Sequence, residues 1–227
     1  MLKLENVKKL YLNNHGLRKT TVSFQEGQIT GILGRNGSGK TTLLKLILGL
    51  IQPDSGNITY LDNPIQEHYD QIAYISEGGS FFPYMNPKEY GNFLASYYPS
   101  FSLTSYHELL SNFEIDLFDK IRNMSKGQQL KLEISAGFAM NAKLIVLDEP
   151  FTTLDIYAKE DTVKLLIEQL KEDTIILIST HNIEEIEHVI DRCLILDDGM
   201  IKEDILMDEL NEKGMDIRTL MDAHRTK

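Results

Sequence analysis

The sequence predicts an α/β fold whose core is a mostly parallel sheet, and two observations carry that prediction. Three short segments (144–147, 175–178 and 194–196) are apolar at every position, which is typical of strands buried on both faces. A glycine-rich loop, Gly34–Thr41, follows a short apolar run and precedes a helical pattern. Strand, glycine-rich loop and helix in this order are the context of a phosphate-binding P-loop, G-x-x-x-x-G-K-[ST], so the expected core is that of a P-loop NTPase.

The first third of the chain is expected to add an N-terminal antiparallel β-subdomain to this core. Gln28–Leu33 predicts the buried strand that leads into the P-loop, and Lys40–Leu50 predicts the helix that leaves it. Pro53 and Gly56 then stop that helix. Turn-forming residues and short apolar runs predict further strands over 2–7, 20–24, 57–61 and 71–76, with a turn over 13–16.

A helical subdomain is expected over residues 78–142, inserted into the α/β core. The start of this stretch is rich in aromatic residues and has no run of β-branched residues. Asn86 and Pro87 are typical of the cap and first position of a helix, and further helices are predicted over 105–112 and from Ser125 onward. We expect the aromatic residues of the first helix to fill the core of the subdomain: Tyr90, Phe93 and Tyr97.

The α/β core is expected to resume at residue 143. Helices are predicted between its buried strands, one with Leu166 on its apolar face and one with Ile183, Ile186 and Ile190. Residues 197–199 predict a hairpin turn, and residues from Asp204 onward predict a short helical tail. We therefore expect one domain over 1–227, with a nucleotide-binding core at 1–77 and 143–205, the helical subdomain at 78–142 and a tail at 206–227.

Composition narrows the possible partners and the compartment. The formal net charge of −11 argues against nucleic acid as the main partner, because phosphate backbones need a basic surface. The single cysteine, Cys193, lies in an apolar run and is expected to be an inert core thiol in a reducing compartment. The apolar stretches are too short to span a bilayer, so we expect a soluble cytoplasmic protein that reaches a membrane only through a partner.

The P-loop itself predicts nucleotide binding. Backbone N–H groups of the loop and the positive end of the following helix hold phosphate oxygens. Lys40 adds a positive charge beside the phosphates, and the hydroxyl of Thr41 is suited to ligate Mg²⁺. The alternative, a merely flexible glycine loop, is disfavoured by the flanking strand and helix patterns.

Two carboxylates follow the buried segment 144–147. Open α/β sheets bind ligands at this end of their strands. Asp148 is expected to hold Mg²⁺ through its second shell, and Glu149 to orient and polarise the water that attacks the γ-phosphate. An acidic surface turn is the alternative, and the nearby P-loop makes it the weaker one.

Two further stretches suggest contacts with an anion. Ser125 caps a helix, Gly127 permits close approach of a ligand, and Gln128 lies in the first turn, which together suggest an anion site. An ordinary capped helix is the alternative. His181 follows a buried strand within reach of the γ-phosphate, although a lone histidine here also suits a cap or a core position.

Taken in order, these motifs resemble those of the ATP-binding subunit of an ABC transporter. Gly34–Thr42 is similar to its Walker A motif, and Leu144–Glu149 to Walker B with its catalytic glutamate. The segment 125–128 resembles the signature sequence L-S-G-G-Q, which separates this family from other P-loop ATPases, and His181 resembles the switch histidine. The resemblance runs from about Leu2 to Ile201, nearly the whole chain.

The resemblance implies ATP and Mg²⁺ as ligands and an ATPase activity. It implies Glu149 and His181 as catalytic residues, and it implies that Mg²⁺ is held by Thr41, Glu77 and Asp148. The implied ATP-binding residues are Tyr11, which matches the aromatic residue that stacks on adenine, Gly34, Asn36, Gly37, Ser38, Gly39, Lys40, Thr41, Thr42, Ser125, Gly127, Gln128, and Asp155 of the D-loop.

Two positions depart clearly from the family pattern, besides the mild replacement of the signature leucine by Met124. Lys126 replaces the first glycine of the signature, while Ser125 and Gly127 remain. Glu77 stands where most members carry glutamine, and it offers Mg²⁺ an oxygen but adds negative charge and, when ionised, has no donor. Short exporter-type (ABC-2-like) members resemble the chain here, which favours export of a peptide, drug or other amphipathic compound.

The resemblance also implies partners. Two cassettes, identical or related, are expected to close head to tail around two ATP molecules, so that Ser125 and Gly127 of one complete the site around Lys40 of the other. An integral membrane permease is expected in the groove between the core and the helical subdomain, at the inner face of the cell membrane. Candidate contacts are Phe81, Phe82 and Tyr84; for Phe81 and Phe82, packing inside the subdomain is an equal alternative.

Two other functions remain compatible with the motifs. A non-transport ABC-type ATPase, such as one that serves iron–sulfur cluster assembly, would show the same set. An interaction protein that binds ATP and signals without turnover is disfavoured, because it would not need Glu149 and His181.

Overall fold

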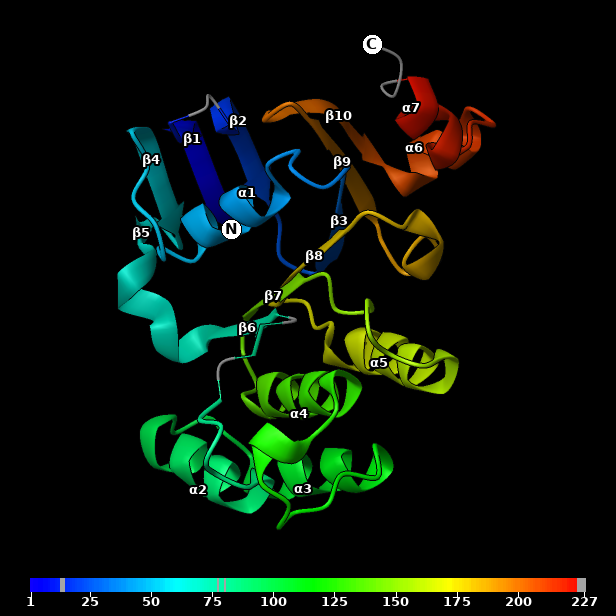
Figure 1. Cartoon of the computed structure of the whole chain (residues 1–227). Coiled ribbons are helices and arrows are strands. Elements are labelled where there is room, and N and C mark those ends of the chain that lie inside the picture. The colour runs from blue at the N-terminus through cyan, green and yellow to red at the C-terminus, as the bar shows by residue number, and fades with distance from the viewer. Residues whose placement is uncertain (13–14, 77, 80, 224–227) are drawn as a thin grey trace.

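The computed structural model describes residues 1–227 apart from 13–14, 77, 80 and 224–227, and it has the expected α/β architecture (Figure 1). The central sheet has the strand order β10-β9-β3-β8-β7-β6, and all its pairs are parallel except β10 with β9. Its strands are β3 (Gln28–Leu33), β6 (Ile72–Ser76), β7 (Leu144–Asp148), β8 (Ile175–Thr180), β9 (Arg192–Asp197) and β10 (Met200–Leu206).

A second, antiparallel sheet is built from the N-terminal part of the chain. It has the order β2-β1-β4-β5. Because β1 lies between β2 and β4, its first residue, Leu2, pairs with Phe24 on one side and with Tyr60 on the other. The strands are β1 (Leu2–Leu10), β2 (Gly16–Phe24), β4 (Ser55–Tyr60) and β5 (Asn63–Pro64). The expected antiparallel β-subdomain is therefore confirmed, while Asn13 and Asn14 of the expected turn lie outside the described residues.

The helices are arranged around these sheets. They are α1 (Lys40–Ile47), α2 (Pro87–Tyr97), α3 (Leu103–Asn112), α4 (Lys126–Ala139), α5 (Ile156–Gln169), α6 (Met207–Glu212) and α7 (Ile217–Ala223), with short 3-10 helices at Ile65–Gln71, Ile121–Asn123 and Ile183–Glu185.

The central sheet divides the interior into two apolar cores. Leu144 and Val146 of β7 pack with α1 and the antiparallel sheet, whereas Ile145 and Leu147 pack with α4 and α5. This alternation follows from the two-residue period of a strand. It explains why the strand sequences are apolar at every position.

The stretch between β6 and β7 forms the helical subdomain, which lies at the lower end of Figure 1. Asn86 caps α2 in a capping box with Glu89, and Pro87 is its first residue, as expected. The buried hydroxyl of Tyr106 on α3 donates to the carbonyl oxygen of Pro87 at 2.9 Å and joins the two helices. Tyr90 is buried, but the expectation for Tyr97 is wrong, because it lies at the last turn of α2 with 68% of its surface exposed.

The helix expected around Ile183, Ile186 and Ile190 is also wrong. Only Ile183–Glu185 forms a short 3-10 turn, because Ile186 leaves the helical conformation with a φ of −132°, and the chain turns again before β9. All three isoleucines are nonetheless buried. A Cβ at Gly31 would lie 3.0 Å from side-chain atoms of Ile186 and of Ile190, so both pack directly onto β3 without a helical backbone.

Two element ends also differ from the predictions. The tail does not become helical at Asp204, because β10 continues to Leu206 and the Asp204 carboxylate accepts two hydrogen bonds of 2.6 Å from Arg192 on β9. Helix α1 ends at Ile47, before the expected Leu50, because Gly49 adopts a φ of +66° and leaves the helical conformation.

Two further observations concern membrane spans and the cysteine, within the described part of the chain. None of the described helices is both long and apolar enough to cross a membrane. Burial raises the pKa of the Cys193 thiol to about 12, as suits an inert core residue.

The close contact between α4 and β6 predicts a destabilising substitution. A Cβ at Gly137 would lie 2.4 Å from Cγ1 of the buried Ile75. Alanine favours a helix by about 1 kcal/mol over glycine, but overpacking costs about 1–3 kcal/mol, so we expect Gly137→Ala to lower the free energy of unfolding. Urea denaturation measures this. Ile75→Val in the same chain removes Cδ1, which would lie 2.6 Å from the new Cβ, and should restore part of the loss. Greater stability in Gly137→Ala alone would contradict the tight contact.

Candidate active site

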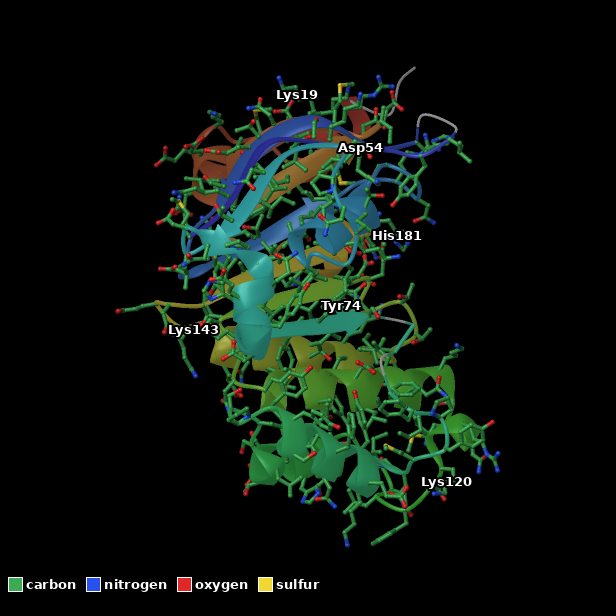
Figure 2. All side chains as sticks on the ribbon, turned by 90° about the vertical axis from the view of Figure 1, so that its left-hand side faces the viewer. Lys19, Asp54, Tyr74, Lys120, Lys143 and His181 are labelled. Atoms are coloured by element: carbon green, nitrogen blue, oxygen red, sulfur yellow. The ribbon has the colours of Figure 1, made fainter. Side chains whose placement is uncertain are left out.

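The candidate site lies where neighbouring parallel strands end, at the edge where open α/β sheets bind ligands. The strand order β3-β8-β7 places three loops next to one another. The P-loop follows β3, His181 follows β8, and Asp148 and Glu149 stand at the end of β7. Residues from distant parts of the sequence therefore meet along one edge, and in Figure 2 the labelled His181 lies at the end of the sheet nearest the P-loop and α1.

The P-loop backbone approaches its neighbours too closely for side chains at two positions. A Cβ at Gly34 would lie 2.3 Å from the carbonyl oxygen of Leu196 on β9. Gly39, the N-cap of α1, has a φ of +110°, and a Cβ there would lie 2.9 Å from the carbonyl oxygen of Gly16 on β2. Both positions therefore require glycine, and the loop is held against both sheets.

Lys40 has an ammonium group that is enclosed by oxygen atoms. The side chain is 5% exposed, and its Nζ donates to the Gly34 carbonyl oxygen at 2.8 Å. The same Nζ lies 3.2 Å from Oε1 of Glu149. Because a buried charge needs charged or hydrogen-bonding partners, this pair ties the start of α1 to the end of β7.

Glu149 is held in a strained backbone conformation that points its carboxylate into the site. Its φ of +52° is in the left-handed region, which is costly for a residue other than glycine. Its N–H donates to the carbonyl oxygen of Ser179 at 3.1 Å and to the Ser179 hydroxyl at 3.2 Å. Its Oε2 lies 2.9 Å from Nδ1 of His181, so the carboxylate bridges Lys40 and His181.

Asp148 and Thr41 provide the oxygens that Mg²⁺ prefers. Oδ1 of Asp148 accepts from the Thr41 hydroxyl at 3.3 Å and from the buried Ser179 hydroxyl. Mg²⁺ in nucleotide sites is held by one or two carboxylates together with phosphate oxygens and water. The described residues contain no group of three or more acidic, histidine or cysteine ligands, so the donor set fits an ion shared with a phosphate and not an all-protein cage.

A cavity of about 340 Å³ opens beside this cluster. Gly34, Asn36 and His181 line it, together with Arg35, Asp197 and Met221 of α7. The hydroxyl of the buried Ser38 has no hydrogen-bond partner within the described structure, which leaves it free for a ligand. Three other P-loop positions are not among the residues that line it: Gly37 and Thr41 are exposed, and Thr42 is half-buried in the first turn of α1.

Tyr11, the expected adenine contact, is less directly placed. It is 46% exposed at the end of β1, in the hairpin whose Gly16 carbonyl oxygen meets Gly39. It is not among the residues that line the cavity. Its role therefore stays a prediction.

The signature residues form a different surface of the chain. Ser125 caps α4 in a capping box with Gln128, and both are exposed. A Cβ at Gly127 would lie 3.0 Å from the carbonyl oxygen of Thr153, so the signature packs against the D-loop. Asp155 caps α5 through the Ala158 N–H and pairs with Lys131 at 3.1 Å, and these contacts lower the pKa of its carboxyl group. Neither these residues nor the neighbouring Lys126 lines the cavity beside the P-loop.

One residue of this site was not predicted from the sequence, and one predicted residue lies outside the described part of the chain. Ser179 connects Asp148 with the Glu149 backbone and is fully buried, yet serine before a switch histidine gave no distinctive pattern. Its position two residues before His181, at the end of a buried strand, was the available hint. Glu77, the third expected metal ligand, lies outside the described residues.

Known proteins resemble this chain in sequence and in structure. The family model described as ABC transporter matches residues 17–152. The ABC transporter ATP-binding protein YtrB of Bacillus subtilis (strain 168) is 34% identical over 227 residues, which cover 98% of this chain and 78% of that protein. The SkfA peptide export ATP-binding protein SkfE of the same organism is 28% identical and covers 94% of this chain and 92% of that protein. A solved structure described as the ATP binding subunit of an ABC transporter matches 100% of both chains with a TM-score of 0.87 and 26% identity.

The double role of Ser179 predicts the effect of removing its hydroxyl. In Ser179→Ala, Asp148 loses a donor inside the protein, so we expect the free energy of unfolding to fall by about 1–3 kcal/mol and ATP hydrolysis to slow. Urea denaturation and a phosphate-release assay measure the two effects. Ser135→Ala is the matched control, because Ser135 is equally buried but only bonds the Lys131 carbonyl oxygen within α4. Equal losses in the two variants would contradict a specific role.

Proposed function

We propose, on the premise that this chain belongs to the ABC transporter family and is an ATP-hydrolysing subunit of it, that two such cassettes close head to tail and drive a membrane permease. The partner cassette is either a second copy or a related chain. Transport is in the direction of export, with a peptide, a drug or another amphipathic compound as cargo. The working complex is peripheral at the cytoplasmic face of the membrane.

One observation carries the head-to-tail arrangement. The P-loop cluster, with Lys40, Glu149 and His181, and the signature, with Ser125 and Gly127, are separate surfaces of one chain. The signature residues are exposed and present a capped helix N-terminus, which favours anions. A second chain that supplies its signature to this P-loop would give the bound phosphates donors from both sides.

Within such a closed site, each residue has a role that its contacts support. Lys40 and the loop N–H groups hold the β- and γ-phosphates. Thr41 and Asp148 would hold Mg²⁺, which supplies charge neutralisation at the phosphates when bound. The Glu149 carboxylate accepts a hydrogen bond from the attacking water and orients it, while His181 holds that carboxylate through its Nδ1. Tyr11 is proposed to stack on adenine, and Asp155 to face the partner cassette.

The permease is proposed to dock at a groove between the core and the helical subdomain. This groove has a volume of about 320 Å³ and is lined mainly by apolar and aromatic side chains: Leu48, Leu50, Tyr69, Ile72, Tyr74, Tyr90, Leu94, Tyr98, Ala136 and Met140. Phe81, Phe82 and Tyr84 do not line it. Phe81 packs against the subdomain core beside Tyr90, whereas Phe82 and Tyr84 are 49% and 74% exposed on the subdomain surface.

The direction of transport rests on the sequence. The signature with Lys126 and the Glu77 position resemble short exporter-type members. SkfE, whose name describes peptide export, is similar over 94% of this chain. These similarities favour an exporter over an importer.

Glu149→Gln tests the paired-cassette mechanism. An amide keeps the shape of the side chain but cannot act as a carboxylate toward water, so hydrolysis should fall by about 10²–10⁴-fold while ATP still binds. We expect this variant to elute as a dimer from gel filtration with ATP and Mg²⁺. The control is Lys40→Ala combined with Glu149→Gln, which should remain monomeric because its phosphate contact is lost. A Glu149→Gln variant that stays monomeric would contradict the mechanism.

Leu50→Arg tests the groove. Leu50 is 57% exposed on the groove wall, so the arginine is tolerated in the free cassette but is desolvated beneath a docked partner. We expect co-purification of an integral membrane protein from native membranes in mild detergent to fall by about tenfold or more. Ile167→Arg on α5 is the matched control, since Ile167 is 55% exposed outside the groove. A membrane protein that remains with Leu50→Arg would place the docking surface elsewhere, and its absence from the unaltered protein would favour a non-transport ATPase.

A further inference from the structure

Tyr74 lies on β6, the edge strand of the central sheet, close to the candidate metal site. The register pairs Tyr74 with Val146 and Ser76 with Asp148 on β7. Alternate residues of a strand share a face, and so do directly paired residues of neighbouring strands. Tyr74, Ser76 and Asp148 therefore all point to the α1 side of the sheet, where Tyr74 and Val146 pack in the same core.

The hydroxyl of Tyr74 lies within reach of two groups on this face, the carboxylate of Asp148 and the side chain of Ser76. Burial, followed by the negative charge of Asp148, raises the pKa of Tyr74 to about 12. A protonated phenol has one hydrogen to donate, and an ionised carboxylate only accepts. Toward Asp148 the Tyr74 hydroxyl can therefore act only as a donor, from the side of the sheet edge.

The same side chain also forms part of the groove wall. Its ring lines the groove together with Tyr69, Tyr90 and Tyr98. Figure 2 faces this edge of the molecule and shows Tyr74 on β6, between the upper layers of the core and the helical subdomain below. Tyr74 is therefore half-buried, with the ring at the groove and the hydroxyl at the metal site.

We propose that Tyr74 is a positioning residue for the magnesium site, and that its hydroxyl, from the groove wall, orients the Asp148 carboxylate for Mg²⁺. The inference rests on the proposed function in taking Asp148 as the residue that holds Mg²⁺ with ATP. Thr41 and Ser179 already donate to Oδ1 of Asp148. A further donor from β6 restrains the carboxylate from a second direction. Partners of this kind typically change metal affinity by about 10–100-fold when they are removed.

Tyr74→Phe removes only the hydroxyl and keeps the ring in the groove. ATP hydrolysis is titrated with Mg²⁺ at a fixed ATP concentration, and ATP binding is measured by calorimetry in EDTA. We expect the variant to need about tenfold more Mg²⁺ for half-maximal hydrolysis, while its ATP affinity in EDTA stays within about twofold of the unaltered protein. A merely structural role would leave the Mg²⁺ titration where it was.

Tyr60→Phe is the matched control. Tyr60 of β4 is buried in the same core, and burial likewise raises the pKa of its hydroxyl to about 12, but Asp148 is not among its contacts. We expect it to leave the Mg²⁺ titration unchanged. An unchanged titration in Tyr74→Phe, an equal shift in both variants, or an ATP affinity in EDTA that falls as much as the Mg²⁺ response would each overturn the inference. Failure of the unaltered protein to bind ATP at all would instead overturn the proposed function.

Discussion

The buried charge of Lys40 is the constraint on which the site depends. With only 5% of the side chain exposed, its ammonium cannot rely on water and must be surrounded by oxygen atoms. The Gly34 carbonyl oxygen and the Glu149 carboxylate supply them. This requirement couples the loop after β3 to the end of β7, and His181 after the intervening strand β8 completes the connection through Glu149.

The two-sided sheet makes this arrangement rigid. Because alternate residues of β7 enter two different cores, the strand that carries Asp148 and Glu149 is packed on both faces. The strained φ of Glu149 persists because the Ser179 backbone and hydroxyl hold its N–H. The insertion between β6 and β7 leaves β6 at the edge, so a groove residue, Tyr74, lies beside the Walker B carboxylate.

Particular residues show where sequence patterns stopped being sufficient. The spacing of Ile183, Ile186 and Ile190 resembles a helix, but the same burial is achieved by packing onto Gly31 of β3, which no local pattern records. A helical tail was expected from Asp204 onward, yet Asp204 forms an ion pair with Arg192 on β9 and remains part of β10. Tyr97 keeps the helical spacing of Tyr90, but at the last turn of α2 it extends beyond the subdomain core.

The sequence by itself determined the α/β class, the P-loop unit, the capped starts of α2 and α4, and the identity of the groups at the strand ends. These features are local: glycine conformations, capping side chains and two-sided apolar runs act within a few residues. Only the tertiary structure decided which of these groups meet. Strand order placed Lys40, Glu149 and His181 in contact, kept the signature on another surface, and put Tyr74 on the same face of the sheet as Asp148. Such contacts join segments that are distant in sequence, so they depend on the register and order of strands, which no single segment specifies.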